Sequence, residues 1–145
     1  NAWVISKSLE TLAVRMDRHC ENALSLSQRL ERLSQIELVK YPFLPSHPQY
    51  EVAKSQMHAG GGIISFVITG GFERVRIFLN QLDLISLTAN LGDIRTIATH
   101  PASTTHGKLS TADRTAIRIS SGLIRLSIGL EHVDDLYEDI ENALR

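Results

Sequence analysis

Cysteine is almost absent from this chain, which has 145 residues and one cysteine, Cys20. A single cysteine forms no disulfide within the chain, and the usual zinc sites need a cluster of cysteines that is missing here. A small secreted domain held by disulfides is therefore excluded. One unpaired thiol suits a reducing compartment, and we expect a cytoplasmic protein.

An excess of charge of one sign is also lacking. The 15 lysine and arginine residues face 16 aspartate and glutamate residues, so the formal net charge is −1. Without a basic field the chain has no general means of holding nucleic acid. Lys7 and Glu10 interrupt the apolar stretch at the start, which excludes a signal peptide or a membrane span there. We expect neither nucleic acid nor membrane as a partner.

The composition that remains is that of an ordinary globular domain. Hydrophobic residues make up 43% of the chain and charged residues 21%, which excludes a disordered chain and a coiled coil. A chain of this length buries enough surface to form a core without disulfides or a structural metal, so we expect one domain over residues 1–145. The chain starts at Asn1, directly in a helical pattern with no capping residue. We therefore expect it to be a piece of a longer protein.

The spacing of apolar residues predicts strands alternating with helices. Steps of three and four residues predict one long amphipathic helix over about residues 2–32. Short apolar runs predict the strands, and renewed helical spacing predicts the later helices. The expected strands are 36–39, 63–68, 84–87, 94–98 and 123–128, with helices at 48–56, after Gly70-Gly71, after Ser110 and from Val133 to the end. This order implies an α/β or α+β domain in which helices cover one face of a small sheet.

Arg125 is the most informative charged residue, because it lies inside an apolar strand pattern. Alternation puts Leu123, Arg125 and Ser127 on one face of that strand and the neighbouring apolar residues on the other. Such an arginine usually faces solvent or a structural carboxylate, and periodicity alone favours that interpretation. The alternative is a guanidinium that binds an anionic ligand at a cleft.

Other charged residues suggest less chemistry. His100 and His106 lack a carboxylate or cysteine at a ligand spacing, so we expect no metal site. The acidic residues between Glu131 and Asp139 are interpreted as helix-start electrostatics and a solvated face.

An ordered set of motifs resembles one enzyme family over essentially the whole chain. The motifs are Asn1-Ala2-Trp3, Leu9-Glu10-Thr11-Leu12, Asn90-Leu91-Gly92-Asp93, His100-Pro101-Ala102-Ser103-Thr104-Thr105-His106, the segment 121–131 and Asp134-Asp135-Leu136. Together they resemble the C-terminal domain of the Cys/Met-metabolism pyridoxal-phosphate enzymes. The resemblance implies the small domain of a fold-type I enzyme, with a mostly antiparallel sheet, helices on one face and a long N-terminal helix.

The resemblance gives Arg125 and Asn90 a role. The family's arginine at this motif holds the α-carboxylate of an amino-acid substrate, and Asn90 occupies a position near the same carboxylate. Pyridoxal phosphate is the implied cofactor, bound by the large domain, which is absent here. The family's Schiff-base lysine follows a Ser-x-Thr pattern, and none of the four lysines here has it. We therefore expect no catalytic and no cofactor-binding residue in this chain, and no turnover by it alone.

Within the family, several features resemble the homoserine-ester sulfhydrylases. These are Asn90, where many members have serine, Thr104-Thr105 after His100-Pro101, and the segment 44–48. The implied function is synthesis of homocysteine from O-succinyl- or O-acetyl-homoserine and sulfide, in an enzyme that is a homotetramer at full length. The alternatives are a cystathionine γ-synthase, a methionine or cystathionine γ-lyase, and an α/β interaction module without catalysis.

Overall fold

The elements of the fold follow the predicted alternation of helices and strands. The structure is a computed structural model that describes residues 2–145, so Asn1 lies outside the described residues. The helices are α1 Ala2–Leu9, α2 Leu12–Leu30, α3 Tyr50–Gln56, α4 Gly71–Gln81, α5 Thr111–Ala116 and α6 Val133–Ala143. The strands are β1 Ile36–Lys40, β2 Ile63–Ile68, β3 Ser86–Leu87, β4 Ile97–Thr99 and β5 Leu123–Ser127. Ser110 caps α5 as predicted, since its side chain accepts a hydrogen bond from the Asp113 N–H.

The strands form one sheet in the order β1-β2-β5-β4-β3. The pairs β1–β2, β2–β5 and β4–β5 are antiparallel, so the sheet is mostly antiparallel, as the family resemblance implied. The predicted strands at 84–87 and 94–98 are shorter than expected, and β3 runs parallel to β4. A tight turn at residues 90–93 would have joined the two strands as an antiparallel hairpin. Instead the connection passes across the sheet and is held by contacts with β5 and the loop after it.

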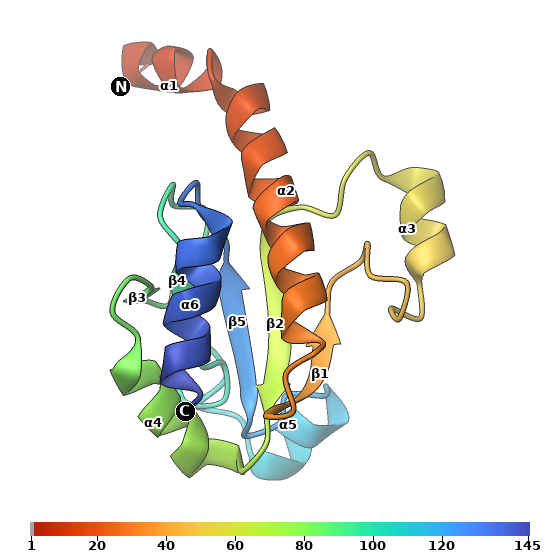
Figure 1. Cartoon of the computed structure of the whole chain (residues 1–145), viewed down its shortest axis with the longest axis vertical. Coiled ribbons are helices and arrows are strands. Elements are labelled where there is room, and N and C mark those ends of the chain that lie inside the picture. Colours follow the sequence, from red (N-terminus) through yellow and green to blue (C-terminus); the bar gives the residue numbers. More distant parts are fainter. Residues whose placement is uncertain (1) are drawn as a thin grey trace.

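One face of the sheet forms the core. Ile64 and Phe66 on β2 lie opposite Leu126 and Ile124 on β5, and all four side chains are fully buried. Helices α2 and α4 pack against the strands, and α6 packs against both of these helices (Figure 1). Phe66 and Phe78 meet edge to face in the centre, with ring centroids 6.0 Å apart. None of the helices in residues 2–145 has the length and apolar character of a membrane span.

The long N-terminal helix predicted over residues 2–32 is wrong in one respect, because it is interrupted at Glu10 and Thr11. The Arg15 guanidinium donates a hydrogen bond to the Ser8 carbonyl at 2.6 Å. In a continuous helix a main-chain N–H of the next turn would donate to that carbonyl instead. Helix α1 buries no residue against the rest of the described chain, and packing does not hold it in line with α2. In Figure 1 it extends away from the sheet at the N-terminal end.

Candidate functional site

Arg125 projects from the open face of the sheet, at the centre of β5. It is half-buried, and its Nη2 donates to the main-chain carbonyls of Ala89 and Asn90, both at 3.1 Å. The same nitrogen lies 3.3 Å from the Thr99 hydroxyl oxygen on the neighbouring strand. These contacts fix the direction of the guanidinium, which leans over β4 toward the segment that follows β3.

The positive charge of Arg125 is not neutralised within the described part of the chain. No carboxylate pairs with it among residues 2–145, although five ion pairs between other lysines or arginines and carboxylates occur there. Its Nε is buried and has no hydrogen-bond partner. A buried donor without a partner costs free energy, so a guanidinium in this state favours an anion that completes its hydrogen bonds. The structural carboxylate considered from the sequence is therefore missing in residues 2–145.

Asn90 lies beside Arg125, although 35 residues separate them. The contact uses the main-chain carbonyl of Asn90, while the residue as a whole is exposed. The segment 88–92 thus passes over the open face with Arg125 beneath it. The structure brings the two sequence-predicted site residues together on one face.

Two polar residues that the sequence analysis did not single out hold this segment. Thr99 donates a hydrogen bond from its hydroxyl to the Thr88 carbonyl, and the Ser127 hydroxyl accepts one from the Gly92 N–H at 3.1 Å. Each of the two side chains belongs to a residue that is only 4% exposed. The signal in the sequence was that each of these hydroxyl residues lies within an apolar strand. This signal indicates a role only once the segment 88–92 is known to cross the face of the sheet that carries Arg125.

A second group of contacts holds the end of the same connection. Thr96 donates to the Glu131 carboxylate from its N–H at 2.6 Å and from its hydroxyl at 2.9 Å, and the Gly129 N–H donates to the Thr96 hydroxyl. A Cβ at Gly129 would meet the main chain of Arg95 and the Ile94 carbonyl oxygen, both at 2.5 Å, so only glycine allows this approach.

The acidic residues after Gly129 therefore do more than the sequence suggested. Glu131 binds Thr96, and the Asp139 carboxylate accepts hydrogen bonds from the N–H groups of residues 83, 84 and 85 at 2.9–3.2 Å. The prediction of a merely solvated acidic face was wrong for these two carboxylates, because each satisfies main-chain donors of a distant segment.

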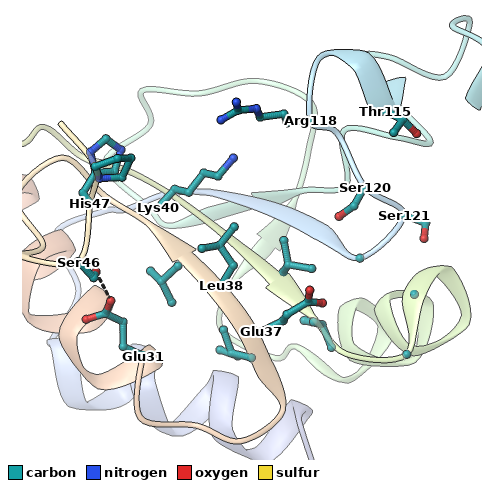
Figure 2. Close-up of a pocket in the computed structure, with 18 of the residues that line it drawn as sticks. Glu31, Glu37, Leu38, Lys40, Ser46, His47, Thr115, Arg118, Ser120 and Ser121 are labelled. Atoms are coloured by element: carbon teal, nitrogen blue, oxygen red, sulfur yellow. Dashed lines mark hydrogen bonds between the residues drawn. The ribbon is translucent and has the colours of Figure 1, made fainter. Parts of the chain in front are cut away.

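A cavity of about 1130 Å³ lies above β1 and β2 and does not include Arg125 or Asn90. Residues of β1, β2, the loop 46–49 and the segment 115–122 line it. Figure 2 shows Lys40, Arg118 and His47 around one part of the cavity, and Glu31 at another, where it accepts a hydrogen bond from Ser46. The cavity belongs to the same open face as Arg125, because Lys40 pairs with Ser65, and Ser65 pairs with Arg125.

Comparison with known proteins agrees with the motifs. A family model described as Cys/Met metabolism PLP-dependent enzyme matches residues 1–145. A methionine gamma-lyase of Pseudomonas putida is 46% identical over 145 residues, covering 100% of this chain and 36% of that enzyme. An O-succinylhomoserine sulfhydrylase of Pseudomonas aeruginosa is 45% identical over 144 residues, covering 99% of this chain and 36% of that enzyme.

A crystal structure gives the same result for the fold. It is assigned as an O-acetylhomoserine (thiol)-lyase from Campylobacter jejuni and contains a lysine carrying the pyridoxyl phosphate group. It superposes with a TM-score of 0.93 at 38% identity, over 99% of this chain and 34% of that one. The chain thus spans about a third of the length of the relatives it matches. By sequence and by fold, the chain belongs to the family of pyridoxal-phosphate-dependent enzymes of cysteine and methionine metabolism.

Proposed function

We propose that this chain is the C-terminal domain of a homoserine-ester sulfhydrylase, in which Arg125 binds the α-carboxylate of the substrate. The reaction replaces the acyloxy group of O-succinyl- or O-acetyl-homoserine with sulfide, which yields homocysteine and the free acid. The observation that carries the proposal is the Arg125 guanidinium, which has no carboxylate partner among residues 2–145 and a buried Nε without an acceptor.

The contribution of this domain is orientation. A guanidinium binds a carboxylate through two parallel hydrogen bonds, so it fixes both the position and the tilt of the substrate. The carbonyls of Ala89 and Asn90 hold Arg125 in one direction, so little freedom remains to be lost when the substrate binds. Alignment of this kind accounts for a substantial part of many rate enhancements.

The residues of this chain do not fit the cofactor's own site. Pyridoxal phosphate is the family's cofactor, and when bound it supplies the electron sink for the bond changes. None of the four lysines follows a Ser-x-Thr pattern, and Lys7 pairs with Glu10 while Lys54 lies over the Tyr50 ring. The cofactor is therefore assigned to the remainder of the full-length enzyme, and the chain alone is proposed to be inactive. The whole enzyme is proposed to be a cytoplasmic homotetramer with a small amino-acid substrate.

A methionine γ-lyase is the second candidate. The relatives named for that activity in Pseudomonas putida and Porphyromonas gingivalis are 46% and 44% identical, as similar as the sulfhydrylases. Both activities require binding of the substrate α-carboxylate, so Arg125 does not distinguish the lyase from the sulfhydrylase. The sequence cues at Asn90 and at 44–48 favour the sulfhydrylase.

The test is a substrate comparison with the full-length enzyme loaded with cofactor. We expect homocysteine from either homoserine ester with sulfide, at a kcat/KM well above that for methanethiol release from methionine. Faster release of methanethiol and 2-oxobutyrate from methionine would overturn the proposal in favour of the lyase. No turnover of any of these amino acids would overturn both candidates.

A further inference from the structure

The strand register places a second cation on the same face as Arg125. Lys40 on β1 pairs with Ser65 on β2, Ser65 pairs with Arg125 on β5, and Arg125 pairs with Thr99 on β4. Directly paired residues in antiparallel strands share a face of the sheet. These four residues therefore form a polar row across four strands, with Lys40 at one end and no carboxylate within it.

Lys40 is open to a ligand in the described structure. It is half-buried, it lines the cavity of about 1130 Å³, and no carboxylate among residues 2–145 pairs with it. In Figure 2 its amine points toward the side of the cavity where Arg118 lies. Arg118 is the one non-glycine residue in 2–145 with a positive φ, 61°, and it also lines this cavity. Glu31 and Glu37 also line the cavity, but neither carboxylate forms an ion pair with Lys40 in the described residues. The unpaired ammonium of Lys40 is therefore available to bind an anionic group of a ligand.

The separation of Lys40 and Arg125 sets the size of a ligand that reaches both. Two strand spacings put their Cα atoms about 10 Å apart. The guanidinium leans away from Lys40, over β4, so the two charged ends lie further apart than that. A chain of eight bonds between two carboxylate carbons is roughly 10 Å long when extended. With a hydrogen bond of about 3 Å at each end, such a ligand bridges cations about 15 Å apart.

We propose that Lys40 binds the distal carboxylate of a dicarboxylic substrate whose α-carboxylate is held by Arg125, which makes the succinyl ester of homoserine the preferred substrate. This inference rests on the proposed function. O-succinyl-homoserine has its two carboxylates eight bonds apart, whereas O-acetyl-homoserine and methionine have no second carboxylate. Lys40 then discriminates between esters that Arg125 treats alike.

The experiment compares the two esters in the full-length enzyme and its Lys40→Met variant. Methionine keeps the unbranched stem and removes only the charge, so β1 retains its packing. We expect the KM for O-succinyl-L-homoserine, relative to that for O-acetyl-L-homoserine, to rise about tenfold to a hundredfold in the variant. Lys40→Arg keeps the charge and is expected to retain most of the preference. Lys54→Met, which removes an exposed lysine from α3, is the matched control and leaves the ratio unchanged.

Binding gives a second readout that does not depend on turnover. The dissociation constant of O-succinyl-L-homoserine, measured by calorimetry in the absence of sulfide, is expected to rise by a similar factor in Lys40→Met. An equal ratio of KM values in the variant and the wild type would overturn the assignment of Lys40 and leave the sulfhydrylase proposal standing. If neither ester is turned over, the proposed function fails. The dissociation constants then test the role of Lys40 alone, and equal values in the wild type and the variant refute that role.

Discussion

Replacement of Arg125 by alanine in the full-length enzyme separates a substrate-binding arginine from a structural one. The substrate carboxylate would lose a charge-assisted, two-point contact in a partly desolvated site, which costs about 2–5 kcal/mol. At about 1.4 kcal/mol for each factor of ten, kcat/KM is expected to fall by a few tens to a few thousandfold. Cofactor binding is expected to persist, because the cofactor is assigned to the rest of the enzyme.

The structure also predicts how much stability the same change removes. Arg125 donates to the carbonyls of Ala89 and Asn90, where water can replace it because these contacts are exposed. A net hydrogen bond contributes about 1 kcal/mol, so the melting temperature should fall by only a few degrees in a protein of this size. The kinetic loss is therefore much larger than the stability loss.

Steady-state kinetics and thermal melting on the same preparation test this reasoning. Arg125→Lys is expected to restore little activity, because an ammonium group cannot bind the carbonyls and a carboxylate in the planar geometry of a guanidinium. Arg76→Ala on α4, which removes an exposed arginine paired with Glu73, is the control and should leave kcat/KM unchanged. An unchanged kcat/KM for Arg125→Ala with a clearly lower melting temperature would refute the substrate role and make Arg125 a structural residue.

Three further results are expected. Phe66→Ala should destabilise the domain by about 3–5 kcal/mol in urea titrations, since the ring is fully buried against Phe78; a loss below 1 kcal/mol would show that this contact is not the centre of the core. Burial lowers the pKa of His100 from its ordinary value of 6.5, so the unfolded chain binds a proton at a higher pH than the folded one, and stability should fall as the pH drops through 6.5. Melting curves from pH 7.5 to 5 should show a weaker pH dependence in His100→Gln than in the wild type. An equal pH dependence in the two proteins would contradict this. The chain alone, mixed with pyridoxal phosphate and reduced with borohydride, should carry no label at any single lysine, and stoichiometric labelling of one lysine would contradict the assignment of the cofactor to the rest of the enzyme.

The sequence predicts the face of a side chain best within a regular strand, where side-chain directions alternate. Alternation on β5 placed Arg125 and Ser127 on one face, and the structure has the same arrangement. The interruption of the N-terminal helix was not predictable from the apolar stripe, because the stripe continues through it. It depends on the contact between the Arg15 guanidinium and the Ser8 carbonyl and on the absence of packing against α1.

The candidate site was predictable in part. The family motifs point to Arg125 and Asn90, and a site across the open face follows once the segment 88–92 is in place. The parallel pairing of β3 and β4, and the contacts of Thr99 and Ser127 that hold this segment, depend on tertiary contacts that periodicity does not encode. The row that joins Lys40 to Arg125 likewise requires the register of three strands.

The position of β5 has a consequence for how the chain is made. This strand comes last in the sequence but lies in the middle of the sheet, between β2 and β4. Until it has left the ribosome, only the pairs β1–β2 and β3–β4 can form, and two-stranded pairs are marginally stable in water. During that interval Ile64 and Phe66 lack their partners Leu126 and Ile124, and the edge of β2 that faces away from β1 stays open to other nascent chains. We therefore expect the growing chain to depend on chaperones until β5 emerges, and to become resistant to proteases in one late step.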